Sequence, residues 1–195
     1  MKNITIIFLC LLLFACPKSI PTVGNYKDDI ERFYPLQKGY SWSYLLTSVL
    51  ENTSSLIKTE VEEVSGNEYK INSNGSVFYY IRTDEGILKK SANYYILKKG
   101  LLKGRDWEFK SSGFTGKITV VDFISKMRVR DNIFKNCIVT EEIIYGQNLL
   151  LRTYYAEGVG PVLIEQYSVK DSKLELNMKA EILGYSFAPI PSEKE

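Results

Sequence analysis

Residues 173–182 read Lys-Leu-Glu-Leu-Asn-Met-Lys-Ala-Glu-Ile, an unbroken alternation of polar and apolar side chains. A period of two places successive side chains on opposite faces of a β-strand, whereas a helix would scatter them around its axis. We therefore expect a strand whose apolar face lies in the core. That face comprises Leu174, Leu176, Met178, Ala180 and Ile182, while Glu175 and Lys179 are expected in water.

The same period recurs at residues 57–62 and 126–130. Other runs are apolar on both faces and favour central strands that are covered on both sides: residues 77–81, 118–124, 149–155 and 162–164. Turn residues such as Asn74-Gly75 separate these runs, because Asn and Gly accept a positive φ. We expect an all-β fold, a meandering antiparallel sheet of about ten strands that is strongly curved or forms a half-barrel. Tyr26 to Tyr34 is expected to form one short helical turn.

One internal repeat is visible, with the pattern Leu-x-Lys-Gly-x-x-Trp-x-aromatic. It runs from Leu36 to Tyr44 and again, 65 residues later, from Leu101 to Phe109. On a strand, the Trp and the aromatic two residues later share one face, so each copy predicts a strand start fixed by a large buried pair. Stacking of the indoles on a carbohydrate is the alternative. The residues concerned are Trp42, Tyr44, Trp107 and Phe109.

The N-terminus has the layout of a secretory signal: Lys2, an apolar run over residues 4–14, then Ala15 and Cys16. The run is shorter than the ~20 residues that span a bilayer. Leu13-Phe14-Ala15-Cys16 resembles the lipobox of bacterial lipoproteins, which implies cleavage before Cys16 and a diacylglycerol on its thiol. We expect a signal helix in residues 1–15, the lipidated Cys16 and a tether in 16–25, one β domain in 26–187, and a flexible tail in 188–195.

Composition removes several classes of chemistry. The chain has no histidine, which excludes Ser-His-Asp and Cys-His catalysis and most zinc sites, although a site made of carboxylates alone stays open. Without residues 1–15 the side-chain charge is 24 minus 23, or +1, so nucleic acid is not an expected partner. Cys137 is then the one cysteine besides Cys16, and we expect it to be buried as a small hydrophobe. No cofactor and no metal are expected.

Three motifs resemble a group of uncharacterised bacterial envelope lipoproteins. They are Tyr-Pro-Leu-x-x-Gly-x-x-Trp-x-Tyr at residues 34–44, Phe-x-x-Cys at 134–137 and Tyr-Tyr-Ala-x-Gly-Val-Gly-x-Val at 154–162. The family often has Pro-Ala-Gly before the second motif, where this chain has Asp131-Asn132, a pair that can make the same turn. The resemblance carries no established activity. It implies an extended antiparallel sheet, with a half-barrel like that of lipoprotein-carrier proteins as an analogy.

Other candidate residues each have an ordinary structural reading. Gly158-x-Gly160 precedes a strand rather than a helix, which predicts a bulge or corner and not a phosphate loop. Glu141 and Glu63 fall on faces that are otherwise apolar; Glu63 is expected at a bulge or strand end, and Glu141 beside a base or in a cavity. The pairs Tyr79-Tyr80, Tyr94-Tyr95 and Tyr154-Tyr155 each put one ring on each face, for a core or a cavity lining.

The alternating cations Lys126, Arg128 and Arg130 form a stripe that can meet an anionic partner, or simply face solvent. Together these features favour a lipid-anchored protein of the bacterial cell envelope. The outer membrane is favoured, since position 17 is Pro and not the Asp that commonly retains lipoproteins at the inner membrane. The expected role of the protein is non-enzymatic binding or assembly, with a lipophilic ligand or an envelope protein as partner. The alternatives are a structural lipoprotein without a ligand cavity and, third, a carboxylate-based enzyme.

Overall fold

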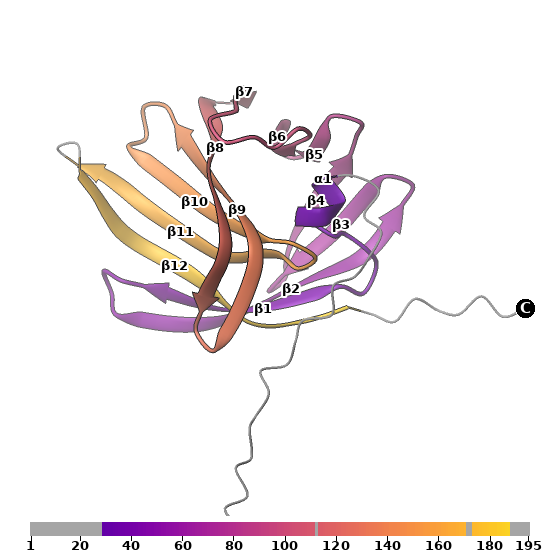
Figure 1. Ribbon diagram of the computed structural model, residues 1–195, viewed down its shortest axis with the longest axis horizontal. Coiled ribbons are helices and arrows are strands. Elements are labelled where there is room, and N and C mark those ends of the chain that lie inside the picture. The colour runs from indigo at the N-terminus through magenta and orange to yellow at the C-terminus, as the bar shows by residue number, and fades with distance from the viewer. Residues whose placement is uncertain (1–28, 112, 171–172, 188–195) are drawn as a thin grey trace, which may run out of the picture.

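The computed structural model describes residues 29–111, 113–170 and 173–187, and these form one twelve-stranded antiparallel sheet (Figure 1). The all-β prediction is confirmed, with twelve strands instead of about ten. The predicted signal helix, Cys16, the tether and the tail lie outside the described residues. The elements are α1 (Asp29–Phe33), β1 (Ser41–Ser48), β2 (Thr53–Ser65), β3 (Glu68–Ser73), β4 (Ser76–Arg82), β5 (Gly86–Lys89), β6 (Tyr94–Lys98), β7 (Asp106–Ser111), β8 (Phe114–Val129), β9 (Asn132–Ile144), β10 (Leu149–Ala156), β11 (Gly160–Lys170) and β12 (Lys173–Ser186).

Neighbouring strands in the sheet are consecutive in the chain except at the centre, where the first and last strands pair. The order runs β6-β5-β4-β3-β2-β1-β12-β11-β10-β9-β8-β7, so β1 and β12 meet in the centre and β6 and β7 are the two edges. The sheet curls until these edges approach each other (Figure 1). Trp107 Nε1 of β7 donates a hydrogen bond to Tyr95 O of β6 at 2.8 Å. The expected half-barrel is therefore nearly closed, and we call the meeting of β6 and β7 the seam.

Helix α1 lies inside the curl of the sheet (Figure 1). Ile30 is 1% exposed and Phe33 is also buried. Tyr34, directly after the helix, has its ring 6.1 Å from that of Trp42 and 6.0 Å from that of Tyr155. A five-residue helix has little stability of its own, so this packing holds it in place.

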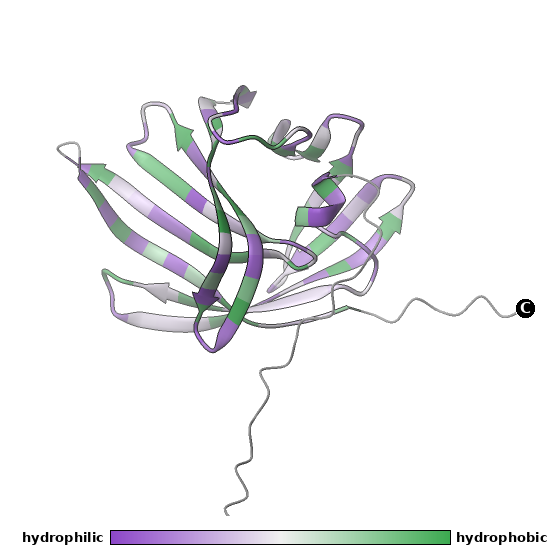
Figure 2. Ribbon diagram, in the orientation of Figure 1, coloured by the Kyte–Doolittle hydropathy of each residue, from purple (hydrophilic) through white to green (hydrophobic). Residues whose placement is uncertain are grey.

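The prediction that four apolar runs are covered on both faces is wrong for residues 77–81. In that run, Val77 and Tyr79 are 43% and 38% exposed, whereas residues 149–155 and 162–164 contain no exposed side chain. The described residues form a single sheet layer plus one short helix, so no second layer covers the outer face. Figure 2 shows apolar residues scattered along the strands among polar ones. Apolar residues on that face pack beside long polar neighbours, as is normal for a protein surface.

The predicted strand over 173–182 is correct, but its faces are only partly as expected. The pairing of β12 with β11 skips Asn177, so that Met178 lies opposite Gln166 and Leu176 opposite Tyr167. Neighbours on β11 point to opposite faces, and the shift therefore turns the first part of β12 over. Ile182 is fully buried, whereas Leu174 is 45% exposed.

Placing Leu174 and Leu176 on the core face was therefore wrong, because a bulge restarts the alternation. Met178 and Ala180 are half-buried. Glu175 is exposed as predicted, and Lys179 is half-buried in an ion pair with Glu181 at 2.9 Å.

The internal repeat has the same backbone hydrogen bonds in both copies. In each, the Gly and the residue after it bond across to one valine, which is fully buried, and the strand pairing then skips the next residue. Glu63 accordingly lies directly beside a bulge. The matched pairs are Gly39 N to Val61 O (2.8 Å) with Gly104 N to Val120 O (2.8 Å), and Val61 N to Tyr40 O (2.9 Å) with Val120 N to Arg105 O (2.8 Å).

Candidate functional site

The first copy of the repeat ties β1 to the corner between β10 and β11. Trp42 is 1% exposed, and its Nε1 donates to Val159 O at 2.6 Å. The hydroxyl of Tyr44 donates to Pro161 O at 2.8 Å. Gly160 has a φ of +101°, and a Cβ there would lie 3.5 Å from Trp42 Nε1. The Gly158-x-Gly160 segment thus forms a tight corner under the indole.

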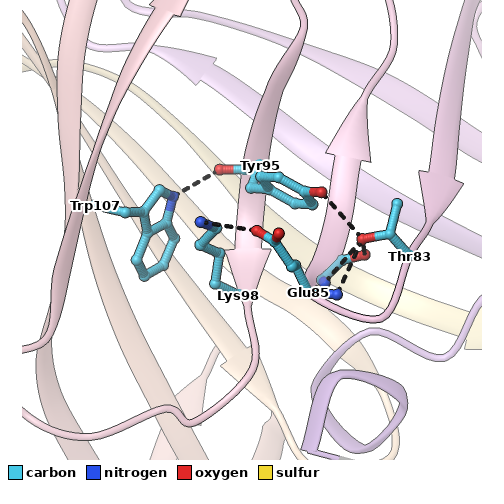
Figure 3. A network of polar contacts seen from close by, with 6 residues as sticks. Thr83, Glu85, Tyr95, Lys98 and Trp107 are labelled. Carbon is cyan, nitrogen blue, oxygen red and sulfur yellow. Dashed lines mark hydrogen bonds and ion pairs between the residues drawn. The ribbon is translucent and has the colours of Figure 1, made fainter.

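The second copy belongs to the seam (Figure 3). Trp107 is 8% exposed and bonds to the backbone of Tyr95, whose hydroxyl accepts from Thr83 Oγ1 at 3.2 Å. Lys98 Nζ lies 3.2 Å from Glu85 Oε2 beside them. Phe109 stacks on Tyr94 with ring centroids 4.3 Å apart. Both indoles are therefore buried in the fold, which leaves no pair of exposed indoles for sugar stacking.

A cavity of about 150 Å3 lies inside the curl, and we call it the tyrosine cavity. Each of the three Tyr-Tyr pairs contributes one ring to it, and Tyr34 contributes a fourth. The outward members differ: Tyr79 is 38% exposed, and Tyr154 bonds to Glu165 at 3.1 Å. The lining is Tyr34, Tyr80, Lys89, Tyr94, Ile96, Ile118, Thr140, Glu142, Leu151, Thr153, Tyr155, Pro161 and Ile164.

Glu142 is the acidic group of this cavity. Its Oε1 accepts a hydrogen bond from the Tyr94 hydroxyl at 2.9 Å. Burial raises the pKa of the Glu142 carboxyl, and the Tyr94 hydrogen bond and the Lys89 ammonium oppose that rise without cancelling it. Burial also raises the pKa of Tyr80 to about 12, with the Glu142 charge as a second cause. The cavity is thus an apolar shell around hydroxyls, one carboxyl and one amine.

The sequence predicts that Glu141 lies either beside a base or in a cavity, and the structure places it beside a base. It pairs with Arg152, Oε1 to Nη2 at 2.6 Å, on the outer face of the sheet. Glu142 was missed, because the register that turns one of two adjacent acids inward is set by the bulge near Val120 and cannot be read from the sequence.

A second hollow, of about 350 Å3, lies between α1 and β8–β9 and is called the helix groove. Its floor is apolar and its rim is polar, a combination typical of ligand sites. Arg32 Nε on the rim lies 2.9 Å from Glu157 Oε1, and Asn136 donates to the other oxygen of the same carboxylate. The floor consists of Phe33, Leu101, Phe123, Ile124 and Cys137, and the rim of Asp29, Arg32, Ser125 and Asn136.

Two charged or reactive groups of the helix groove have shifted pKa values. The Arg32 guanidinium holds the pKa of the Glu157 carboxyl below its usual range. Burial raises the pKa of the Cys137 thiol to about 12, so it is neutral at physiological pH. A neutral, 1% exposed thiol is a poor nucleophile, and Cys137 serves as part of the groove floor.

The remaining predicted residues lie apart from both hollows. Lys126, Arg128 and Arg130 are exposed along β8 and the turn that follows it. Cys16 falls outside the described residues. Within residues 29–111, 113–170 and 173–187, no three Cys, Asp or Glu side chains gather as a metal ion would require. In that same part of the chain, no helix has the length and hydropathy needed to cross a membrane.

Comparison with known proteins gives distant structural likenesses. No family model matches the chain, and no curated protein matches it. The chain is similar to a "putative exported protein with YmcC-like fold" from Bacteroides fragilis, at 12% identity and a TM-score of 0.44, over 80% of this chain and 99% of that one. It is also similar to a "putative lipoprotein" from Parabacteroides distasonis, at 13% identity and a TM-score of 0.37, over 79% of this chain and 98% of that one. A third similar structure is that of MucB, at 11% identity and a TM-score of 0.40, over 84% of this chain and 57% of that one. All three TM-scores are below 0.5.

Proposed function

We propose that this chain is a lipid-anchored protein of the bacterial cell envelope that binds an amphipathic ligand without covalent chemistry. The anchor follows from the Leu13-Phe14-Ala15-Cys16 sequence. A diacylated cysteine holds a protein on a bilayer durably, because each buried CH2 contributes ~0.8 kcal/mol. The absence of histidine from the sequence favours binding over catalysis.

The helix groove is the observation that supports ligand binding. Its volume of about 350 Å3 falls within the range of small-molecule sites, and five apolar side chains make its floor. Ser125 on the rim is exposed, and its hydroxyl can donate a hydrogen bond to the polar end of an amphipathic molecule. The tyrosine cavity supports this less well, since about 150 Å3 suits a few water molecules better than an acyl chain.

A structural role without a ligand is the second candidate. The aromatic rings of Tyr34, Trp42 and Tyr155 and the helix fill most of the space inside the curl. A filled interior is what a rigid assembly module needs, since it presents a stable outer surface.

Fluorescent fatty-acid binding separates these two functions. The chain from residue 16 on, secreted behind a general leader with Cys16→Ser, is titrated with dansyl-undecanoic acid. Phe123 and Leu174 are matched at 46% and 45% exposed, but only Phe123 lines the groove. We expect Phe123→Asp to weaken binding at least tenfold and Leu174→Asp to leave it unchanged, with equal melting temperatures checked for both. No saturable binding by the parent protein would support the structural role instead.

The anchor is tested separately on the full chain. Cys16→Ala should abolish the acyl mass and release the protein from the detergent phase or leave it unprocessed. Partition into detergent with unchanged mass in Cys16→Ala would contradict the lipoprotein assignment.

A further inference from the structure

The β8–β9 hairpin carries a cationic surface that the proposed function does not use. Over residues 124–137 it has four basic side chains and one acidic one, Asp131. All four are exposed, at the end of the longest hairpin of the sheet (Figure 1). We call this end the cationic arm; its basic side chains are Lys126, Arg128, Arg130 and Lys135.

Seven lysines elsewhere on the sheet have acidic partners, whereas the four cations of the arm have none among the described residues; Lys110, Lys170 and Lys173 also have none but belong to two separate strand ends. Lys126 lies directly opposite Lys135 in the strand pairing, an arrangement that is destabilising for like charges. Elsewhere, lysines pair with acids on the sheet surface: Lys58 with Glu60, Lys70 with Glu63, Lys90 with Glu68, Lys98 with Glu85, Lys103 with Asp122, Lys117 with Asp106 and Lys179 with Glu181. An arm with four unpaired cations and a single acid suits an anionic partner from outside the chain.

The path of the chain points to the membrane as that partner. Asp29, the first described residue, lines the helix groove together with Ser125 and Asn136, the neighbours of Lys126 and Lys135. Arg32 and Asn136 both hold Glu157, which fixes α1 to the base of the arm. Asp29 stands thirteen positions after Cys16, and this length of chain reaches about 45 Å at full extension. The described part of the chain therefore begins beside the base of the cationic arm, within reach of a tether to Cys16.

We propose that the cationic arm rests on the anionic headgroups of the bilayer to which Cys16 is anchored. This inference uses the anchor of the proposed function and not its groove. A lipid chain combined with a basic patch is a known way to hold a protein on a membrane, and here the patch also sets orientation. With the arm on the lipid, the neighbouring helix groove opens next to the membrane surface, where amphipathic ligands reside.

Amine acetylation of the native lipidated protein provides the test. The protein is reconstituted in vesicles of phosphatidylcholine alone or with 30% phosphatidylglycerol, and each lysine is followed by mass spectrometry. We expect acetylation of Lys126 and Lys135 to fall at least fivefold on the anionic vesicles. The exposed Lys110, Lys170 and Lys173 should react equally on both and serve as internal controls. Salt at 0.5 M should restore the reactivity of the arm, because it screens such contacts.

A pair of matched variants shows whether the protection depends on the arm. Arg128→Gln with Arg130→Gln should remove at least half of the protection of Lys126 and Lys135. Lys170→Gln with Lys173→Gln removes the same charge from another hairpin end and should change nothing.

Three outcomes overturn the proposal. Equal acetylation of Lys126 on both vesicles shows that the arm does not touch anionic lipid. Protection of Lys126 by soluble polygalacturonate but not by vesicles assigns the arm to a polysaccharide. Failure of the protein to enter either vesicle defeats the anchor itself, and with it the argument from the tether; this failure is recognised by the missing protein in the vesicle fraction.

Discussion

The two copies of the repeat have the same local backbone but different neighbours. The first copy, residues 36–44, leads into β1, which pairs with β2 on one side and β12 on the other. The second copy, residues 101–109, leads into β7, which pairs with β8 alone. Trp42 is 1% exposed and Trp107 is 8% exposed. The motif thus sets the backbone geometry at the start of a strand. The segment that the indole binds depends on the position of that strand in the sheet.

In the centre of the sheet, the Trp42 indole stabilises the corner between β10 and β11. At the edge, the Trp107 indole links two strands that do not pair through their backbones. Trp42 donates to Val159 O in a tight turn of the β10–β11 connection. Trp107 donates to the backbone of Tyr95 across the seam, where the strand order shows no β6–β7 ladder among the described residues. A seam held by side chains should be the first part of the sheet to open.

Removal of the central indole should have the largest effect. Trp42→Ala is expected to lower the free energy of unfolding by about 4 kcal/mol, because it leaves a large cavity and strands the carbonyl of Val159. Urea unfolding followed by circular dichroism measures this loss. A cost below about 1 kcal/mol would show that the corner does not depend on the indole.

Removal of the edge indole should cost less and act locally. Trp107→Ala is expected to lower the free energy of unfolding by about 2–3 kcal/mol, at the low end for buried aromatics, because the seam already lacks strand pairing. Hydrogen exchange should speed up at β6 and β7 before any other strand. If Trp107→Ala and Trp42→Ala cost the same and exchange rises everywhere, the distinction between centre and edge is wrong.

A glycine substitution on each side of the comparison probes the packing more gently. A Cβ on Gly116 would lie 2.3 Å from the Ile143 backbone oxygen and 2.4 Å from Phe109 Cζ, whereas nothing lies within 4 Å of a Cβ on Gly184. Gly116→Ala should therefore destabilise by about 1–3 kcal/mol through overpacking at the seam. Gly184→Ala is the control and should be neutral or slightly stabilising. Thermal unfolding distinguishes them, and a neutral Gly116→Ala would mean that the Phe109 ring and the Ile143 backbone both move aside at little cost.

The sequence predicts the strand period and the repeat but not the bulges. Alternation over residues 173–182 correctly indicates a strand, because one polar and one apolar side chain per repeat has a single explanation. The skip at Asn177 reverses the faces of Leu174 and Leu176, and its position depends on how β11 pairs with β12. The position of a bulge depends on partner strands that are far away in the sequence, so a local sequence pattern does not predict it.

The candidate site was less predictable for the same reason. The Tyr-Tyr pairs indicate that one ring of each faces inward, yet the convergence of Tyr80, Tyr94 and Tyr155 on one cavity follows from the sheet order. The helix groove joins Phe33 to Phe123 and Cys137, which are about 90 to 104 positions apart in the sequence. The sequence could predict that single residues are apolar and buried, but not that these residues come together in one groove.

The smallest effect expected here depends on pH and separates the two halves of the comparison. Tyr44 of the central copy donates to a backbone carbonyl, which does not titrate, whereas Tyr94 at the seam donates to the Glu142 carboxyl. Burial raises the pKa of Glu142 in the folded protein above its unfolded value. The folded state therefore binds more protons in the window between these two values, and stability falls as the pH rises through it.

Glu142→Gln removes that charge and keeps an acceptor for Tyr94. At neutral pH it should raise the free energy of unfolding by less than about 1.5 kcal/mol, the scale of one hydrogen bond, and the gain should vanish at pH values below the unfolded pKa. Urea midpoints for the parent and the variant between pH 4 and 8 measure the difference. Since the opposing Lys89 ammonium also faces the cavity, Lys89→Gln should enlarge the stabilisation that Glu142→Gln produces. If the difference in unfolding free energy between the parent and Glu142→Gln stays constant across this pH range, Glu142 titrates as an ordinary exposed acid. Burial of its charge at the seam would then cost no stability.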